Sequence, residues 1–340
     1  MPRTVILGTG RAVPERVVTN DDLAQQMDTS DEWIRERTGI RERHWIRPGE
    51  TGVALGKAAS MAALEAAGVE PGELDGIVYA NCTPDYFLPG NGVLLQHELG
   101  AGPIPALDIR MQCSGFIYAL QVADAFIRLG TYRRVLVVGQ EVQSTRMDVS
   151  TRGRGTAVIF ADGAGAVVVG PSQEPMGSDP IKNGERGVLG FDLHGDGGQA
   201  QKLWAEGPGA IGNPPVSVKD WEAGKYFLTM DGREVFRHAV SRMPESVRAA
   251  LAAVGHAPKD IDLLIPHQAN LRISEAVQKN LELRDDQVYN NIDRYGNTTA
   301  ATIPIALDEC VRSGRVKPGD LLVFTAFGSG FLWGSVVLRY

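Results

Sequence analysis

Three side chains of this 340-residue chain could carry out covalent chemistry on a carbonyl group: Cys113, His267 and Asn297. A cysteine thiol is a nucleophile, a histidine can exchange a proton with it, and an amide donates a hydrogen bond without changing charge. An apolar run predicts a strand before Cys113, and apolar residues recur at helical spacing after it. A thiol at a helix N-terminus has a lowered pKa, so a thiolate is expected. Taken alone, however, a free cysteine is usually a small buried hydrophobe.

Two further segments indicate a reactive site. His267 follows the apolar strand predicted at 263–265 and a proline, whereas the other five histidines lie in polar or helical contexts. Near the C-terminus, Gly328-Ser329-Gly330 permits a close backbone approach. The backbone N–H groups of Ser329 and Cys113 are therefore predicted to form an oxyanion hole.

The composition predicts an enzyme-sized globular protein. The hydrophobic content is 43% and the net charge is −7, which argues against nucleic acid or an anionic membrane as a partner. No apolar run approaches the ~18 residues of a membrane span, and the N-terminus lacks a signal-peptide core, so a cytoplasmic location is expected. Cys82, Cys113 and Cys310 form no metal-type or redox-type pair, so no metal site is predicted.

An internal repeat divides the chain. Residues 62–75 and 249–262 share the Ala-Ala-Leu, Gly, Pro and Asp positions, and 128–130 matches 312–314. Carrying that second register backwards places Cys113 opposite Asn297. The repeat predicts an α/β fold of two pseudo-twofold-related halves, 1–172 with the cysteine and 173–340 with the histidine and asparagine. Gly/Pro-rich insertions are expected within 171–225.

Five motifs in order resemble the β-ketoacyl-acyl-carrier-protein synthase III family of the thiolase superfamily. They span nearly the whole chain, apart from the looser 171–225 region, and are Asp31–Arg43, Gln112–Phe116, Pro266–Arg272, Tyr295–Ala300 and Phe327–Ser335. The resemblance implies a five-layered αβαβα fold. It also implies a decarboxylative Claisen condensation of an acyl-coenzyme A primer with malonyl carrier protein, which initiates fatty acid synthesis.

The resemblance also implies roles for individual residues. Cys113 would carry the acyl group, and His267 and Asn297 would hydrogen-bond the malonyl thioester, without any cofactor. The coenzyme A site would contain Trp33, Arg37, Arg154, Gly232 and Asn270. The acyl carrier protein would dock on Arg237, Arg272 and Lys279. In the expected homodimer, Leu88 would close the acyl pocket of the partner subunit.

Met111-Gln112 before the cysteine depart from the family pattern, so the acyl length stays open. One alternative is a related thiolase-fold acyltransferase or condensing enzyme of specialised metabolism, which uses medium or long acyl chains or an oxygen or nitrogen nucleophile. A remote alternative is a papain-like cysteine hydrolase, which has the same residue types in the same order. A non-catalytic partner subunit is opposed by the presence of Cys113.

Overall fold

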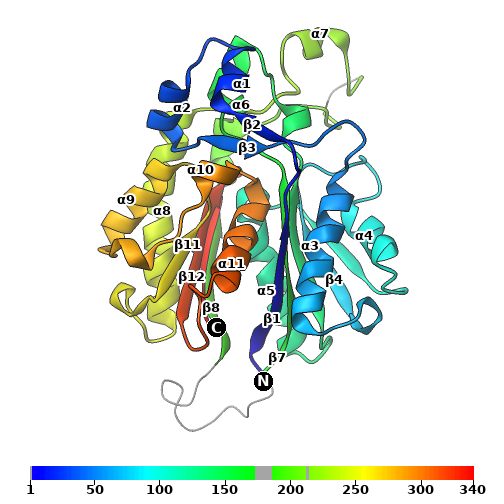
Figure 1. Ribbon diagram of the computed structural model, residues 1–340, viewed down its shortest axis with the longest axis vertical. Helices are drawn as coiled ribbons and strands as arrows, with labels where there is room; N and C mark the ends of the chain where they lie inside the picture. Colours follow the sequence, from blue (N-terminus) through cyan, green and yellow to red (C-terminus); the bar gives the residue numbers. More distant parts are fainter. Residues whose placement is uncertain (1, 173–185, 212–213) are drawn as a thin grey trace.

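Two β-sheets alternate with three layers of helices (Figure 1). The computed structural model describes residues 2–172, 186–211 and 214–340. Helices α3 (Gly52–Ala67) and α4 (Asn91–Leu99) cover the outer face of the first sheet. Helices α5 (Gly115–Arg128) and α11 (Thr302–Arg312) lie between the sheets, and α8 (Gly232–Ala253) and α9 (Leu271–Leu281) form the last layer. The predicted five-layered αβαβα architecture is confirmed.

The first sheet has five strands in the order β1-β7-β6-β4-β5. Their bounds are β1 (Thr4–Ala12), β7 (Gly163–Pro171), β6 (Val135–Glu141), β4 (Gly76–Ala80) and β5 (Ala106–Ile109). β4 is parallel to both β5 and β6, whereas β7 is antiparallel to β6 and β1. Parallel strands place their carboxyl ends at one edge, so β4, β5 and β6 all deliver the following residues to the same end of the sheet.

The second sheet repeats this pattern. Its four strands have the order β11-β12-β13-β8, with bounds β8 (Gly187–Gly195), β11 (Leu263–Pro266), β12 (Leu321–Gly328) and β13 (Leu332–Arg339). β12 is parallel to β11 and antiparallel to β13, which is antiparallel to β8. The series β8, β13, β12, β11 therefore matches β1, β7, β6, β4 in order and direction. Two pseudo-twofold-related halves are thus confirmed.

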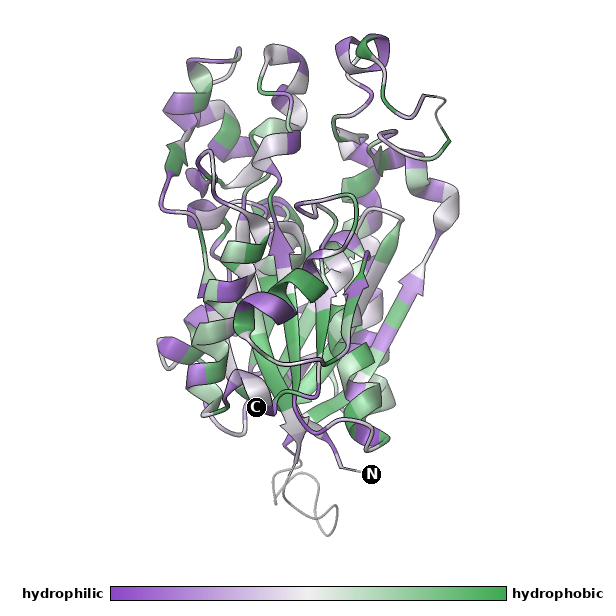
Figure 2. Ribbon diagram, turned by 90° about the vertical axis from the view of Figure 1, so that its right-hand side faces the viewer, coloured by the Kyte–Doolittle hydropathy of each residue, from purple (hydrophilic) through white to green (hydrophobic). Residues whose placement is uncertain are grey.

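Both sheets are buried on both faces, because helices cover each of them. Their inner strands, such as β6 and β12, are accordingly near-continuous apolar runs, which Figure 2 shows as green ribbons in the centre of the molecule. α5 packs on β6 and β4 on one side and on β12 and β13 on the other. The helix that follows Cys113 is therefore in the middle of the core.

Helix α3 shows why the local sequence has its pattern. Thr51 accepts a hydrogen bond from the N–H of Ala54 at the start, and Gly68 ends the helix in the left-handed conformation with φ 62°. The helix packs so closely on β1 that a Cβ at Gly10 would lie 2.5 Å from the backbone nitrogen of Ala63. The glycines of β1 thus serve helix packing.

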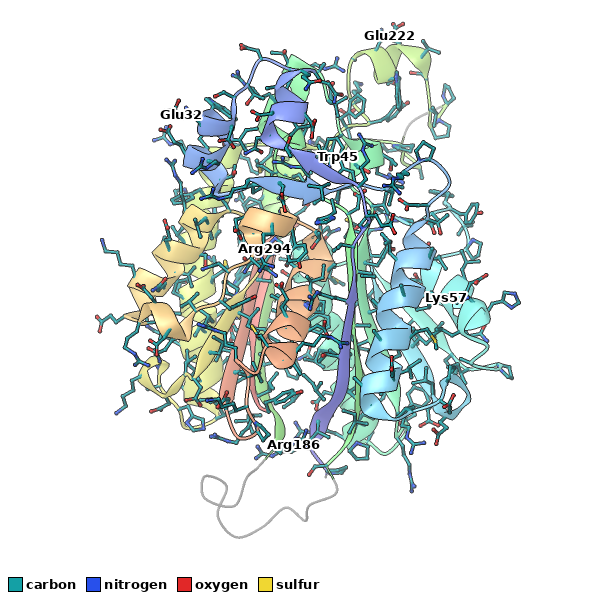
Figure 3. All side chains as sticks on the ribbon, viewed as in Figure 1. Glu32, Trp45, Lys57, Arg186, Glu222 and Arg294 are labelled. Carbon is teal, nitrogen blue, oxygen red and sulfur yellow. The ribbon has the colours of Figure 1, made fainter. Side chains whose placement is uncertain are left out.

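Shorter elements form a cap over the strand ends. They are β2 (Val17–Thr19), α1 (Asn20–Ala24), α2 (Asp31–Thr38), β3 (Glu42–His44), α6 (Arg154–Ala157), β9 (Leu203–Trp204), α7 (Val218–Glu222), β10 (Thr229–Met230) and α10 (Ile292–Tyr295). Trp45 anchors this cap, since its indole N–H donates to the carbonyl of Phe160 at 3.1 Å (Figure 3). Helix α2 begins after Ser30, which caps the N–H of Trp33.

The Gly/Pro-rich region from 171 to 225 lies partly outside the described residues. Its described part contributes β8 to the second sheet and the short pieces β9 and α7 to the cap. The predicted boundary between 172 and 173 falls where residues 173–185 lie outside the described part, so it stays a prediction.

The predicted opposition of Cys113 and Asn297 is wrong. In the first half, the 3₁₀ turn η2 (Gln112–Ser114) precedes α5, and in the second half η8 (Thr299–Ala301) precedes α11. Each turn begins at a residue with positive φ, 43° at Gln112 and 53° at Thr299. Cys113 is therefore equivalent to Ala300. The register taken from the helix ends fails because α5 has 14 residues and α11 has 11.

Candidate active site

Cys113 lies in the turn η2, immediately before α5, and is 7% exposed. The end of β12 from the other half packs directly against it: a Cβ at Gly328 would lie 2.6 Å from the Cβ of Cys113. A side chain at position 328 would displace the cysteine. The close approach expected of the Gly328-Ser329-Gly330 segment is therefore present in the fold.

The thiol of Cys113 is neutral at rest, because burial and, to a smaller extent, the carboxylate of Glu141 raise its pKa to about 12. Hydrogen bonds from the backbone N–H groups of Ser329 and of Cys113 itself oppose this shift. The prediction of a resting thiolate is wrong, since the desolvation of the thiol outweighs the helix N-terminus. The two N–H groups predicted as an oxyanion hole do point toward the sulfur.

His267 follows β11 and is 2% exposed. Burial lowers its pKa to about 3, so the imidazole is neutral. Its Nδ1 lies 2.7 Å from the hydroxyl oxygen of Thr302, which also lies 3.1 Å from the carbonyl oxygen of Thr299. Nε2 is buried and has no hydrogen-bond partner among the described residues. The Thr302 hydroxyl therefore decides which ring nitrogen carries the hydrogen.

Asn297 is held by its backbone against the segment after α6. Its N–H donates to the carbonyl of Ile159 at 2.9 Å, and its carbonyl accepts from the N–H of Ala161 at 3.0 Å. In the side chain, Oδ1 accepts from the N–H of Thr299 at 2.8 Å. This fixes the orientation of the amide, so Nδ2 remains as a donor.

The loop 297–302 connects His267 and Asn297 to a cavity that Cys113 lines, although neither of these two residues lines that cavity itself. Thr299 links to Asn297 through its N–H and to His267 through Thr302. Thr299 also lines a cavity of about 310 Å³ together with Cys113 and Ser329. Sequence reasoning assigned no role to either threonine, although Thr299 lies within the Tyr295–Ala300 motif and Thr302 lies two residues beyond it.

A third missed residue is Glu141, the last residue of β6, whose side chain is fully buried. Burial raises its pKa to about 7. Its carboxylate accepts hydrogen bonds from the hydroxyl of Thr83 at 2.6 Å and from the thiol of Cys82 at 3.2 Å. The sequence feature that could have identified Glu141 is an acidic residue at the end of an apolar strand. Glu141 is thus a titratable group close to the nucleophile.

The residues predicted to bind coenzyme A gather at a second cavity of about 440 Å³. Trp33, Arg37, Gly232 and Asn270 line it, and the side-chain amide of Asn270 donates to the carbonyl of Arg37 at 2.9 Å. The guanidinium carbons of Arg37 and Arg154 lie 4.4 and 4.8 Å from the centre of the Trp33 ring. An adenine inserted between Trp33 and Arg154 would have to displace that arginine.

The predicted docking residues lie on the last helical layer. Arg272 lines the rim of the second cavity, and Lys279 is exposed further along α9. Arg237 is exposed on α8 and forms an ion pair with Glu234 at 2.6 Å. Leu88 is 78% exposed in the loop before α4 and lies outside the cavity at Cys113. A single chain therefore leaves this leucine without a pocket.

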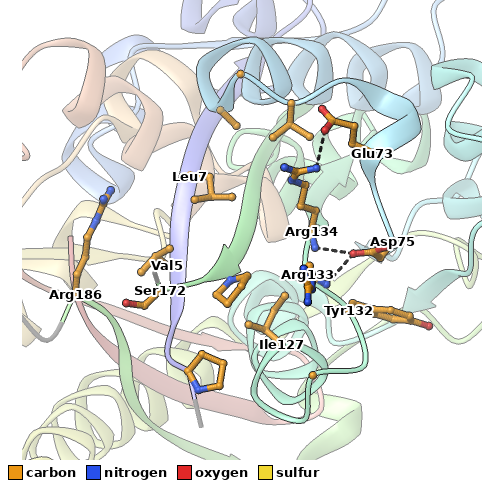
Figure 4. A pocket seen from close by; sticks show the side chains of 16 residues that line it. Val5, Leu7, Glu73, Asp75, Ile127, Tyr132, Arg133, Arg134, Ser172 and Arg186 are labelled. Atoms are coloured by element: carbon orange, nitrogen blue, oxygen red, sulfur yellow. Dashed lines mark hydrogen bonds and ion pairs between the residues drawn. The ribbon is translucent and has the colours of Figure 1, made fainter. Parts of the chain in front are cut away.

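A larger cavity, of about 1080 Å³, lies beside the N-terminal end of β1 (Figure 4). Arg134 pairs there with Glu73 at 2.7 Å, and the backbone N–H of Arg133 donates to Asp75 at 2.7 Å. This cavity contains none of the predicted site residues, so cavity volume does not identify the reactive site.

Across the described residues, no cluster of three or more His, Cys, Asp or Glu side chains could hold a metal ion. Within the same part of the chain, no helix has the length and apolarity of a membrane span.

The duplicated five-layered fold, with a cysteine at the junction of its halves, defines an acyltransferase of the thiolase fold. Models of the 3-oxoacyl-[acyl-carrier-protein] synthase III family match residues 107–197, and models of the C-terminal part of that family match residues 251–340. The chain belongs to this β-ketoacyl-acyl-carrier-protein synthase III family.

Individual relatives agree. The chain is 46% identical to a β-ketoacyl-acyl-carrier-protein synthase III of Xanthomonas euvesicatoria pv. vesicatoria over 98% of both proteins. The crystal structure of 3-oxoacyl-acyl-carrier-protein synthase III from Aquifex aeolicus superposes with a TM-score of 0.89 at 41% identity, covering 99% of this chain and 100% of that one. The priming β-ketosynthase of the R1128 polyketide pathway has a TM-score of 0.90 at 35% identity over 99% of this chain and 96% of its own. The predicted family is confirmed, and the papain-like alternative is wrong.

Proposed function

We propose that this chain condenses an acyl-coenzyme A primer with malonyl carrier protein through an acyl group on Cys113, as the first condensation of fatty acid synthesis. One observation carries the proposal. The sulfur of the buried Cys113 accepts a hydrogen bond from the N–H of Ser329. Hydrogen bonds of the loop 297–302 connect His267 and Asn297 to the cavity that Cys113 lines. Nε2 of His267 has no hydrogen-bond partner among the described residues, and the hydrogen bond to Oδ1 of Asn297 leaves Nδ2 as a donor, so both atoms would be available to the substrate.

In the first step, the neutral imidazole of His267 accepts the thiol proton as the sulfur of Cys113 attacks the thioester carbonyl. The N–H groups of Cys113 and Ser329 stabilise the oxyanion, which can supply a large part of the rate enhancement. The tetrahedral intermediate then expels coenzyme A, whose thiolate takes up the proton from the histidine. This step needs Nε2 as an acceptor, the state in which the Thr302 hydroxyl donates to Thr299.

In the second step, malonyl carrier protein loses CO₂, and the electron pair of the broken bond forms an enolate. Asn297 Nδ2 and His267 Nε2 donate hydrogen bonds to its oxygen. The enolate carbon attacks the acyl group, the new carbon–carbon bond forms, and the Cys113 thiolate leaves and takes up a proton from solvent. His267 acts as a donor when the Thr302 hydroxyl turns to Nδ1, which leaves the hydrogen on Nε2.

The other predicted residues would bind coenzyme A, the carrier protein and a partner subunit. The second cavity would hold coenzyme A through Trp33, Arg37 and Arg154. The carrier protein would dock on Arg272 at this cavity and on Arg237 and Lys279 of the same helical layer, where cations favour an acidic partner. A homodimer is supported by the edge strand β5 and by the neighbouring exposed apolar side chains of residues 86–88. In it, the partner's Leu88 would enter the acyl cavity. The cytoplasmic location stays a prediction.

The test is intact-protein mass spectrometry with acyl-coenzyme A thioesters from acetyl upward, followed by a chase with malonyl carrier protein. A single acyl adduct should form and should disappear on the chase with release of a β-ketoacyl product. Cys113→Ala should show no adduct. An adduct that survives the chase would refute the condensation, and no adduct with any thioester would refute the nucleophile.

A second candidate is a condensing enzyme of specialised metabolism. The likeness to the priming β-ketosynthase of the R1128 pathway favours it, as does the polar lining of the cavity at Cys113. Efficient acylation by acetyl-coenzyme A supports fatty acid initiation, whereas acylation by longer or substituted thioesters alone supports the specialised reaction.

A further inference from the structure

The cavity beside Cys113 has an unusual wall for a saturated acyl chain. Phe160, Leu203 and Leu228 make one part of its lining apolar, but Gln143 lies in the lining as well and is only 5% exposed. The Nε2 of Gln143 donates to the hydroxyl oxygen of Thr299 at 2.9 Å and to the sulfur of Cys82 at 3.6 Å. This glutamine therefore adjoins the loop that carries the catalytic asparagine.

The hydrogen bonds fix the orientation of this amide. The thiol of Cys82 donates its hydrogen to Glu141 at 3.2 Å, so its sulfur can only accept from Gln143. Nε2 must therefore face Cys82 and Thr299, and Oε1 must face the other way. In the part of the chain that the structure describes, Oε1 has no hydrogen-bond partner.

A second acceptor lies next to the nucleophile. The Oε1 of Gln112 is buried without a hydrogen-bond partner among the described residues, and Gln112 lines the same cavity. A buried acceptor that stays unpaired loses the hydrogen bonds it had with water, which is unfavourable. A saturated acyl chain in this cavity would leave both oxygens unpaired.

We propose that the acyl group carried by Cys113 bears a hydroxyl group, which donates a hydrogen bond to Oε1 of Gln143. This inference rests on the acyl-cysteine step of the proposed function and specifies the acyl group. A hydroxyl-bearing acyl group is the substituted primer expected of the second candidate reaction. A carbonyl oxygen of glutamine accepts but cannot donate, so it selects a hydroxyl over a methylene or a ketone. Sites that hydrogen-bond a substrate hydroxyl reject the analogue without it far more strongly than apolar pockets reject an added group.

A carboxylate-bearing acyl group is the less well supported hypothesis for this cavity. Arg110 and Arg146 also line the cavity, and neither forms an ion pair with another described residue. Both are exposed, however, and exposed guanidinium groups attract a carboxylate only weakly. The amide of Gln143, which is 5% exposed, is the more selective group, because an acyl chain that fills the cavity removes water from it.

The test is a competition between matched thioesters for Cys113. Butyryl- and hexanoyl-coenzyme A each compete with their 3-hydroxy and terminal-hydroxy derivatives, and intact mass gives the adduct ratio. A hydroxyacyl derivative should form the adduct at least about tenfold faster than its saturated parent, as expected for one buried hydrogen bond. The 3-oxo derivative should show no such gain.

Three outcomes separate the claims. Equal or faster acylation by the saturated parent in every pair overturns the hydroxyl proposal and leaves the proposed function intact. Faster acylation by succinyl- or glutaryl-coenzyme A than by any hydroxyacyl thioester assigns the cavity to a carboxylate instead. No adduct with any thioester overturns the proposed function itself.

Gln143→Leu sharpens the result, because it removes the acceptor at similar volume. The variant should lose the preference for the hydroxyacyl group and be acylated faster by the saturated parent. Gln143→Met should behave alike, which guards against a folding defect of one variant. Gln25→Leu makes the same change on the exposed surface and should keep the wild-type ratio. An unchanged ratio in both Gln143 variants overturns the proposal.

Discussion

The same junction occurs twice in this molecule, with different contents. In each half a short 3₁₀ turn with positive φ at its first residue leads into a central helix, and the second residue of the turn is Cys113 in one half and Ala300 in the other. Each of these packs on a glycine in a strand of the opposite half, Gly328 for Cys113 and Gly139 for Ala300. Only one of the two junctions carries a nucleophile.

The difference lies in the surroundings. Cys113 lines a cavity, whereas Ala300 is 1% exposed and lines none of the cavities described above. The second junction instead carries polar groups on either side of its turn, Asn297 before it and Thr302 after it. Duplication thus supplied two equivalent positions. One half now presents the nucleophile, and the other presents the hydrogen-bond donors.

Among the variants that separate the roles of the two halves, Asn297→Ala should have the largest effect. The first half should still acylate Cys113, while condensation should fall by about 10²–10³, as when one donor to a developing oxyanion is removed. Acylation is measured by intact mass, and condensation by release of the β-ketoacyl product. Loss of acylation in this variant would contradict the division between the halves.

His267→Ala gives the matched comparison. Because the thiol of Cys113 has a pKa of about 12, its attack needs a base, so this variant should slow acylation as well as condensation. Equal behaviour of the two variants would mean that His267 serves condensation only.

A smaller effect is expected for Thr302→Val, which preserves the shape of the side chain but removes its hydroxyl. Nδ1 of His267 then loses its partner and the ring loses control over its tautomer. The rate of condensation should fall by about tenfold with little change in KM, and Thr302→Ser should restore it. A rise in KM alone, or no rescue by serine, would indicate a packing role instead.

Glu141→Gln tests the effect of the Glu141 carboxylate on the pKa of Cys113. Ionised Glu141 raises the pKa of Cys113, so the variant should be alkylated by iodoacetamide with a profile shifted to lower pH. The exposed Glu65→Gln is the control. An unshifted alkylation profile would remove Glu141 from the site.

The same variant changes the pH dependence of stability. Burial raises the pKa of Glu141 from 4.5 to about 7, so its contribution is fully present below pH 4.5 and is lost as the pH rises through 7. Relative to Glu141→Gln, the wild type should therefore lose about 3 kcal/mol over that range. His267, whose pKa is lowered to about 3, works in the opposite direction between pH 3 and 6.5 but is common to both proteins. Denaturant titrations at several pH values measure the difference.

The sequence could predict the features that local pattern determines. The strand before His267, the glycine approach at Gly328 and the two equivalent halves all follow from apolar runs, glycine positions and the repeat. The equivalence of Cys113 with Ala300 could not be predicted in this way. It depends on backbone φ angles at Gln112 and Thr299 and on the unequal lengths of α5 and α11.

The protonation state of Cys113 could not be predicted from the sequence, for a different reason. A helix N-terminus is visible in the sequence and favours a thiolate, but the burial that overrides it is a property of the packed fold. Thr302 contacts His267 across 35 residues, and Glu141 reaches Cys82 across 59. Such contacts require the three-dimensional path of the chain, and no motif records them.

The smallest expected effect addresses the two junctions themselves. Ala300→Cys, introduced into Cys113→Ala, places a thiol at the equivalent position of the other half. Acylation by acetyl-coenzyme A should stay at the level of Cys113→Ala alone, because position 300 lines no described cavity and packs against Gly139 and Gly115. Alkylation in denaturant would verify that the new thiol is intact. An acyl adduct at position 300 would show that the repeated turn is sufficient for reactivity, whereas its absence assigns reactivity to the cavity and to the N–H of Ser329.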